Sequence, residues 1–459
     1  MLSTIELQSC SFSGLVPNSM ANLARLLYLD LSSNMFTGTI PSFRTSRNMT
    51  HIDLSRNDLM GPIPFSHFKG LLDLEYIDLR FNSFNGSIPS SLFGLPSLQK
   101  LLLANNHFDG LHADFSNASV PHLDTLDLSS NNLRGPIPFS IFELRRLNVL
   151  LLSSNNLNGS IQLEMFQRFS DLTVLDLSYN QLSVDANGSN SSFSSFPHIA
   201  ALKLASCNLQ SFPDLKNQSK LFYLDLSDNK IGGKIPNWIW GVGDGALVHL
   251  NLSYNLLVGL QEPFVFPSLG ILDLHANHIR GKIPTLPQDI TYVDYSNNNF
   301  NCSIPLDIGN NLTSAYFFSV SNNNLTGNIP ESICNARYIQ NLQLSNNHFD
   351  GLLADFPNAS LSQLDTLDLS SNYLSGPIPM SLFELGRLNI LSLSSNNLNG
   401  SIQLEMFQRL SNLTYLDRSY SRLSIDANGS NFDVPSFPKF STLQLASCNL
   451  QRFPKLKKQ

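Results

Sequence analysis

Two histidines and one glycine-rich stretch come nearest, by residue type and spacing, to the signatures of metal or enzymatic chemistry. His275 and His278 lie three residues apart, and we find no cysteine or acidic partner that completes a metal-ligand set with them. Gly241, Gly243 and Gly245 resemble a phosphate-binding loop only superficially, because they do not lie between a long strand and a nucleotide-binding helix. Serine is so frequent that no Ser-His-Asp arrangement stands out. The sequence therefore predicts that the chain is not an enzyme and binds no cofactor and no metal.

The composition narrows the function classes further. Hydrophobic residues make up 42% of the 459 residues, enough for a continuous core, while charged residues make up only 14%. The formal net charge of -7 argues against a nucleic-acid partner. The first residues lack the basic and apolar stretches of a signal peptide, and no run of ~20 apolar residues predicts a membrane helix. Five cysteines are too few for a disulfide framework, although a pair between Cys302 and Cys334 is left open.

A repeat of about 24 residues runs through the whole chain. Its template is L-x-x-L-x-L-x-x-N, as at Leu26, Leu29, Leu31 and Asn34. We call the last position of this template the ladder position. Nineteen residues occupy it: Cys10, Asn34, Asn57, Asn82, Asn106, Asn131, Asn155, Asn180, Cys207, Asn229, Asn255, Asn277, Asn298, Asn323, Asn347, Asn372, Asn396, Ser421 and Cys448. The spacings run from 21 to 27 residues, so the sequence predicts one array over 1–459 with no inserted island.

Each part of the repeat predicts a piece of structure. The L-x-L alternation predicts a short strand, and stacked repeats predict one parallel sheet on the concave side of a curved solenoid. The ladder amide is expected to turn inward, where it can donate to and accept from neighbouring backbone; Cys10, Cys207 and Cys448 are interpreted as small buried thiols at the same depth. Glycine and proline in G-x-I-P segments, such as 38–41, predict short 3-10 or extended turns on the convex side.

The G-x-I-P signature makes the chain resemble the extracellular leucine-rich repeats of plant receptor-like proteins and receptor kinases, which are α/β-type leucine-rich-repeat solenoids. The segments 90–99, 175–180 and 183–186 are similar to the Verticillium-wilt-resistance type of receptor-like protein. That resemblance implies a signal peptide, terminal caps, an island and a membrane helix. The chain shows none of these and no kinase residues, so we interpret it as an ectodomain truncated at both ends.

A longer period lies over the first. Residues 124–182 and 365–423 are identical at 46 of 59 positions, and the same offset extends the duplication to 104–213 and 345–454. In the second copy, an inward strand position changes from Leu177 to Arg418, and the ladder position changes from Asn180 to Ser421. Two interpretations stay open: the Arg418 side chain reaches solvent along its stem, or the second copy has begun to decay.

Exposed columns of the predicted sheet carry the candidate ligand-binding residues. Tyrosine and arginine are preferred anchors of interfaces, although tyrosine is also an ordinary strand former. The candidates are Tyr28, His51, Arg56, Tyr76, Arg80 and Phe81 in a first cluster and Tyr223, His249, Tyr254, His275 and Tyr292 in a second. A neighbouring column is aspartate in ten repeats, at 30, 53, 78, 127, 176, 225, 273, 294, 368 and 417. We interpret it as a solvated column that keeps the sheet face in register, or as a surface for a basic ligand.

Fifteen N-x-S/T sequons fit a secreted protein and mark candidate glycosylation sites. They are Asn48, Asn85, Asn117, Asn158, Asn187, Asn190, Asn217, Asn251, Asn301, Asn311, Asn324, Asn358, Asn399, Asn412 and Asn428. Asn251 lies inside a predicted strand, where a glycan would block the concave face.

The resemblance implies a function in ligand binding. We expect the ectodomain of a plant cell-surface receptor-like protein in pathogen perception and defence signalling, located at the plasma membrane or outside the cell. Its partners would be a protein or peptide on the concave face and, by family analogy, a co-receptor kinase. Two alternatives are an apoplastic inhibitor of a microbial wall-degrading enzyme, against which the absence of caps argues, and a nonfunctional truncated paralogue.

Overall fold

The computed structural model describes residues 2–111, 122–186, 198–263, 266, 269–352, 361–426 and 440–450. The chain forms two compact units. Unit 1 comprises Met1–Ile231 with Val242–Asp244, and unit 2 comprises Gly232–Gly241 with Gly245–Gln459. Unit 1 contains the first copy of the duplication and unit 2 the second. That the two units form one continuous array stays a prediction.

Each unit is built on a parallel sheet to which every repeat contributes one three-residue strand, and we call it the main sheet. In unit 1 its strands, in spatial order, are β1 (Thr4–Glu6), β3 (Tyr28–Asp30), β5 (His51–Asp53), β7 (Tyr76–Asp78), β9 (Lys100–Leu102), β11 (Thr125–Asp127), β13 (Val149–Leu151), β15 (Val174–Asp176), β17 (Ala201–Lys203) and β18 (Tyr223–Asp225). In unit 2 they are β20 (His249–Asn251), β22 (Ile271–Asp273), β24 (Tyr292–Asp294), β26 (Phe317–Ser319), β28 (Asn341–Gln343), β30 (Thr366–Asp368), β32 (Ile390–Ser392), β34 (Tyr415–Asp417) and β36 (Thr442–Gln444). The described residues thus contain nineteen such strands, one for each predicted repeat.

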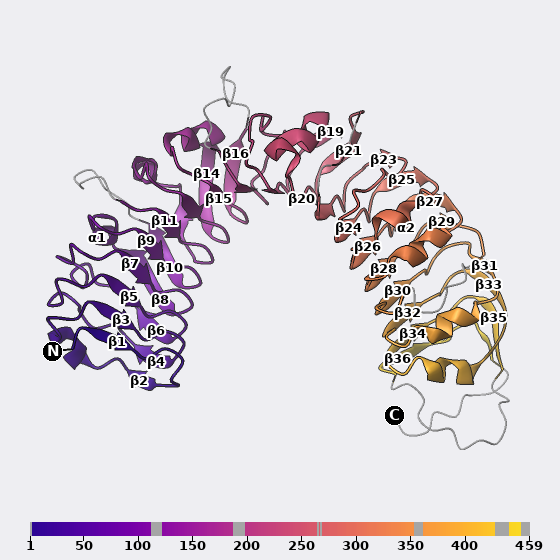
Figure 1. The fold of residues 1–459 in the computed structure, drawn as a ribbon, viewed down its shortest axis with the longest axis horizontal. Coiled ribbons are helices and arrows are strands. Elements are labelled where there is room, and N and C mark those ends of the chain that lie inside the picture. Colours follow the sequence, from indigo (N-terminus) through magenta and orange to yellow (C-terminus); the bar gives the residue numbers. More distant parts are fainter. Residues whose placement is uncertain are drawn as a thin grey trace. The chain divides into compact units, whose positions relative to one another are not determined.

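The G-x-I-P halves do more than turn the chain, because many of them pair into shorter parallel sheets, a second layer that we did not predict. In unit 1 these strands are β2 (Ser13–Leu15), β4 (Met35–Gly38), β6 (Asp58–Gly61), β8 (Ser83–Ile88), β10 (His107–Leu111), β12 (Arg134–Gly135), β14 (Asn156–Gln162) and β16 (Gln181–Asp185). In unit 2 they are β19 (Gly232–Ile235), β21 (Leu256–Leu260), β23 (Arg280–Gly281), β25 (Asn299–Cys302), β27 (Asn324–Gly327), β29 (His348–Phe349), β31 (Ser375–Gly376), β33 (Asn397–Gln403), β35 (Arg422–Asp426) and β37 (Asn449–Leu450). In unit 2, Figure 1 shows the main-sheet strands from β24 to β36 along the inner side of the bend. The second-layer strands from β23 to β35 lie along its outer side.

Within the described residues, helical structure is confined to short connections, as the sequence predicts. The α-helices there are α1 (Ser90–Phe93) and α2 (Ile308–Asn311). The 3-10 helices are η1 (Asn18–Asn22), η2 (Phe139–Glu143), η3 (Leu163–Arg168), η5 (Asn237–Gly245), η6 (Glu331–Asn335), η7 (Met380–Glu384) and η8 (Leu404–Arg409). Among the described residues, none of these helices has the length and apolar character needed to cross a lipid bilayer.

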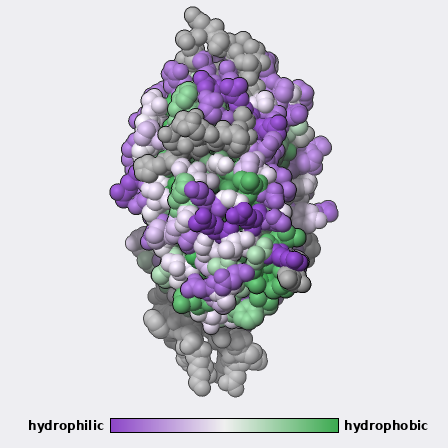
Figure 2. Space-filling view, turned by 90° about the vertical axis from the view of Figure 1, so that its left-hand side faces the viewer, coloured by the Kyte–Doolittle hydropathy of each residue, from purple (hydrophilic) through white to green (hydrophobic). Residues whose placement is uncertain are grey.

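The core lies between the main sheet and the second layer. The middle residue of a main-sheet strand points inward, and Leu29, Ile52 and Ile77 are fully buried there. Apolar side chains also reach the surface, such as Leu15 and Phe65. Figure 2 accordingly shows hydrophobic residues interspersed with hydrophilic ones on the face that it presents.

The ladder amide joins each repeat to the one before it. The Asn131 side chain is 7% exposed. Its Nδ2 donates to Leu103 O of the preceding repeat (3.1 Å) and to Leu128 O and Ser129 O of its own (3.1 and 3.2 Å). Its Oδ1 accepts from the Phe108 amide, also in the preceding repeat, at 3.1 Å. The predicted role is therefore confirmed: one buried side chain satisfies backbone groups of two turns at once.

Three ladder positions hold cysteine, and the prediction of a buried thiol is correct for one of them. Cys207 is fully buried, and burial raises the pKa of its thiol to about 12. Cys10 is exposed and Cys448 is half-buried, because each has a described repeat on one side only. No disulfide joins Cys302 and Cys334, the pair that we left open.

The glycine-rich stretch forms a turn. Gly243 has a φ of 67°, and its amide donates to Gln218 O at 2.7 Å. A Cβ atom at this position would lie 2.1 Å from Leu221 O, so only glycine fits. The structure gives this glycine a packing role and offers no phosphate loop here.

Candidate functional site

The first predicted cluster forms a stack of rings across three neighbouring strands of unit 1. Tyr28, His51 and Tyr76 are aligned in register on β3, β5 and β7. The Tyr28 and His51 rings stack at 4.3 Å, and the His51 and Tyr76 rings at 4.1 Å with an interplanar angle of 2°. Burial in this stack lowers the pKa of His51, so the imidazole is neutral at neutral pH. We call these three residues the aromatic stack.

Charged groups border the aromatic stack on the same face. Arg80 forms a bidentate contact with Asp78, with Nη2 to Oδ2 at 2.6 Å and Nε to Oδ1 at 3.0 Å. The Tyr76 hydroxyl donates to Asp78 at 3.3 Å. Arg56 lies over the Phe81 ring, with its guanidinium carbon 4.3 Å from the ring centre. Four residues of the first predicted cluster are thus linked through the stack and Asp78, and Arg56 and Phe81 form a contact of their own.

The second predicted cluster divides. In unit 1, the Lys203 ammonium lies over the Tyr223 ring, 4.9 Å from the ring centre. In unit 2, the edge of one ring meets the face of the other between Tyr254 and His275, at 4.6 Å. Tyr292 stacks instead on Phe317 of the next strand, at 4.5 Å, a partner that we did not predict.

His249 occupies the first position of β20. The register places Ile271 between it and Tyr292, so these two candidates lie two strands apart. The members of the predicted cluster that lie in unit 2 therefore do not form one group, and the ring contacts there are separate and local.

Backbone conformation supplies a second criterion for ligand contact. The residue just before the ladder position has a φ between 52° and 57° in all nineteen repeats, and most repeats place Ser, Asn, Asp or Ala there. Large side chains in this left-handed conformation cost about 1 kcal/mol each. Five repeats nevertheless place exposed large residues there: Arg56, Phe81, Tyr179, Tyr254 and Tyr420.

A large exposed residue kept against local preference points to a role outside the fold. Three of the five residues are among our candidates. Tyr179 and Tyr420 are not among the candidates predicted from the sequence, although their template positions directly before Asn180 and Ser421 could have identified them.

The aspartate column has a structural role that we did not predict. In each of the ten repeats, one carboxylate oxygen accepts the amide hydrogen two residues later, at 2.9 to 3.1 Å. This turn ends the strand and orients the side chain. Asn251 makes the same bond to the Ser253 amide, at 3.0 Å. The column is therefore a set of strand terminators, four of them buried and six half-buried.

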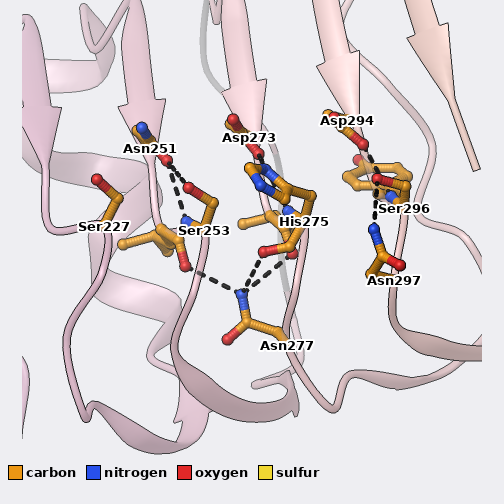
Figure 3. Close-up of polar contacts among 12 residues, drawn as sticks. Ser227, Asn251, Ser253, Asp273, His275, Asn277, Asp294, Ser296 and Asn297 are labelled. Atoms are coloured by element: carbon orange, nitrogen blue, oxygen red, sulfur yellow. Dashed lines mark hydrogen bonds and ion pairs between the residues drawn. The ribbon is translucent and has the colours of Figure 1, made fainter.

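The prediction that His275 lacks an acidic partner is wrong. Its Nδ1 lies 2.7 Å from Asp273 Oδ1, and Asp294 lies beside Asp273 on the next strand (Figure 3). A strand places residues two apart on the same face, and sheet pairing brings in the third, which linear spacing cannot show. His278 is exposed.

Ten of the fifteen sequons fall on described residues, and eight of these are exposed. Asn251 and Asn311 are half-buried and use their amides in the fold. Asn251 accepts from the Ser253 amide and hydroxyl, and Asn311 donates to Leu286 O. Asn117, Asn187, Asn190, Asn358 and Asn428 lie outside the described residues.

We predict unequal glycan occupancy when the chain is secreted from plant cells behind an added signal peptide. Asn85 and Asn158 should carry glycans, whereas Asn251 and Asn311 should stay bare, because their amides are engaged and partly covered. Glycopeptide mass spectrometry measures the occupancy of each site. A glycan on Asn251 would contradict the described geometry and would cover the sheet face near His249.

The comparisons with known proteins agree with this geometry. A leucine rich repeat family model matches residues 62–108, and a second one matches 25–44, 122–144, 220–242, 316–336 and 363–385. The chain is a leucine-rich-repeat protein. The recurring ladder, the parallel strands and the match of the family models to both units decide this point.

Plant receptor-like proteins are the relatives of this leucine-rich-repeat chain. Receptor-like protein 54 of Arabidopsis thaliana is 35% identical over 195 residues, covering 41% of this chain and 23% of that protein. Receptor-like protein 39 is 34% identical over 314 residues, covering 67% and 35%. The chain therefore spans about a third or less of the length of these relatives.

A solved structure with the same fold is that of the Arabidopsis receptor kinase HAESA in complex with the peptide hormone IDA and the co-receptor SERK1. It is 26% identical to the leucine-rich-repeat chain, with a TM-score of 0.75, and the match covers 98% of this chain and 79% of that one.

Proposed function

We propose that this chain is the ligand-binding part of a plant cell-surface receptor-like protein and that it binds an extended peptide on the main-sheet face of unit 1. The observation that carries the proposal is the aromatic stack with its flanking Arg56 and Phe81. Rings on three consecutive repeats present a continuous apolar strip with charged borders, the composition of an interface centre. HAESA, a protein of the same fold, is described in complex with a peptide.

The left-handed residues strengthen this assignment. Arg56 and Phe81 precede the ladder asparagines Asn57 and Asn82 with a φ of 55°, a conformation that favours smaller residues. Their side chains contact each other and stay exposed on the face. A purely structural role would be better served by serine or asparagine, as in most other repeats.

We further propose that the whole protein acts at the plasma membrane in pathogen perception, through a co-receptor kinase. The resemblance to receptor-like proteins of the wilt-resistance type supports the defence role, and the receptor-like relatives support the cell-surface location. The HAESA structure, which is described with a co-receptor, supports a partner in signalling.

The test separates binding from folding. A phage-displayed random peptide library is selected on the chain, and enriched peptides are measured against His51→Ala and Phe81→Asn. We expect about tenfold weaker binding to either variant, the scale of one aromatic anchor. Thermal stability of Phe81→Asn should be unchanged or slightly higher, because asparagine accepts the left-handed conformation more readily than phenylalanine.

The matched control is Phe65→Asn, which removes a similarly exposed phenylalanine from a position outside the stack. It should leave peptide affinity as it is. Enriched peptides that bind all variants equally, or a library that yields no enriched peptide, would refute the proposed face.

A further inference from the structure

Asp273, His275 and Asp294 form a compact group on the main-sheet face of unit 2. Their candidate ligand atoms all lie within 4.8 Å of one another. Asp273 and Asp294 end the neighbouring strands β22 and β24 in matching register, and His275 folds back against Asp273 (Figure 3). The two aspartates are 9% and 8% exposed, and the His275 side chain is 22% exposed.

The strand-ending turns hold this group rigidly and leave oxygens available. Oδ1 of Asp273 accepts the His275 amide at 3.0 Å, and Oδ1 of Asp294 accepts the Ser296 amide at 2.9 Å. The second oxygen of Asp294 lies 3.5 Å from the Tyr292 hydroxyl. Each carboxylate is thus fixed by one oxygen and can offer the other to a ligand.

The charge of this group is not balanced by a permanent cation in the described contacts. Two nearly buried carboxylates lie side by side, and burial together with the charge of Asp273 raises the pKa of Asp294. The hydrogen bond to Asp273 raises the pKa of His275, with Asp294 adding to the effect. In unit 1 the equivalent place after Asp78 holds Arg80, which neutralises that carboxylate directly. Here a titratable imidazole replaces the arginine.

We propose that Asp273, His275 and Asp294 bind one divalent transition-metal ion. Imidazole nitrogen with carboxylate oxygens suits ions such as Mn²⁺, Zn²⁺ and Fe²⁺. An ion bound at ~2.1 Å needs its ligand atoms about 3.4 Å apart, so atoms that lie as much as 4.8 Å apart would have to approach by up to about 1.4 Å. Rotation of the carboxylates about their soft terminal torsions supplies that movement. Three protein ligands leave coordination positions open towards solvent.

The site requires the imidazole to be deprotonated at the coordinating nitrogen. A proton on that nitrogen competes with the ion, so affinity should fall as the pH falls.

The experiment titrates the full chain with Mn²⁺ at pH 7.5 and follows the loss of the free-ion signal by electron paramagnetic resonance. Mn²⁺ is used because it avoids thiolates, and Cys10 and Cys302 are exposed. We expect one ion per chain, at least tenfold weaker binding in His275→Gln and Asp294→Asn, and weaker binding at pH 5.5. Asparagine at 294 should preserve the turn, because Asn251 makes the same bond one strand before β22.

Two controls match these variants. His278→Gln removes a neighbouring exposed histidine, and Asp368→Asn removes the same charge from a strand terminator that has no histidine beside it. Neither should change the affinity. Absence of Mn²⁺ binding to the wild-type chain, or binding that survives both His275→Gln and Asp294→Asn, would overturn the proposed site. Peptide binding in unit 1 is measured separately, so either proposal can fail alone.

Discussion

Replacing Arg418 by leucine should stabilise the repeat that contains β34 by about 2 to 4 kcal/mol, the range for exchanging a poorly paired buried charge for an apolar side chain. Arg418 is fully buried, and Nη2 donates to Leu423 O at 3.3 Å. Nε and Nη1 find no partner among the described residues. Burial also lowers the pKa of the guanidinium. The interpretation that this side chain reaches solvent is therefore wrong, because the core encloses the whole side chain.

Hydrogen exchange shows where the stability changes. Amides after about Ser411 should exchange faster than those after Ser170 in the other copy, and Arg418→Leu with Ser421→Asn should slow them. Ser421 bonds only Arg418 O of its own repeat in the described contacts, whereas Asn180 also bonds Leu152 O of the repeat before.

The reciprocal variant in the first copy, Leu177→Arg, should reproduce the faster exchange. Equal protection of the two copies in the wild-type chain would mean that the buried guanidinium is accommodated, and the interpretation as decay would fall.

Asn131→Ala should destabilise unit 1 by about 3 kcal/mol, because it removes a nearly buried amide and leaves the Phe108 amide hydrogen without its acceptor. Urea unfolding, followed by circular dichroism, measures the change. Asn132→Ala is the matched control, since Asn132 is the next residue and is exposed. It should stay within about 0.5 kcal/mol of the wild type. A loss of similar size in both variants would show that the ladder bonds contribute little.

The repeat made most of the fold predictable. The L-x-L alternation places one strand in every repeat, and the ladder residue identifies its own bonding partners, because a side chain that is buried and polar must be satisfied by nearby backbone. The second layer of strands was not predictable from the G-x-I-P segments. Proline limits pairing along a segment, and whether two extended segments meet depends on the stacking of whole repeats.

The candidate site was predictable only where its residues occupy the same template position in successive repeats. Tyr28, His51 and Tyr76 occupy equal template positions, so parallel register had to align them. Asp273 and Asp294 also share a column, but their partnership with His275 depends on how an imidazole folds back at the end of a strand. The burial of Arg418 depends on side-chain rotamers too, which a pattern of letters does not contain.

The ladder bonds imply an order in which the repeats complete their hydrogen bonds during synthesis. Each asparagine reaches back to the preceding repeat, as Asn131 does to Leu103 and Phe108. A ribosome releases the chain from its amino terminus, so a repeat receives its last hydrogen bonds only after about 24 further residues have emerged. The growing chain therefore always ends in one unfinished turn, and each turn is closed by its successor. During assembly of such an array, each newly folded repeat therefore stabilises the repeat that precedes it.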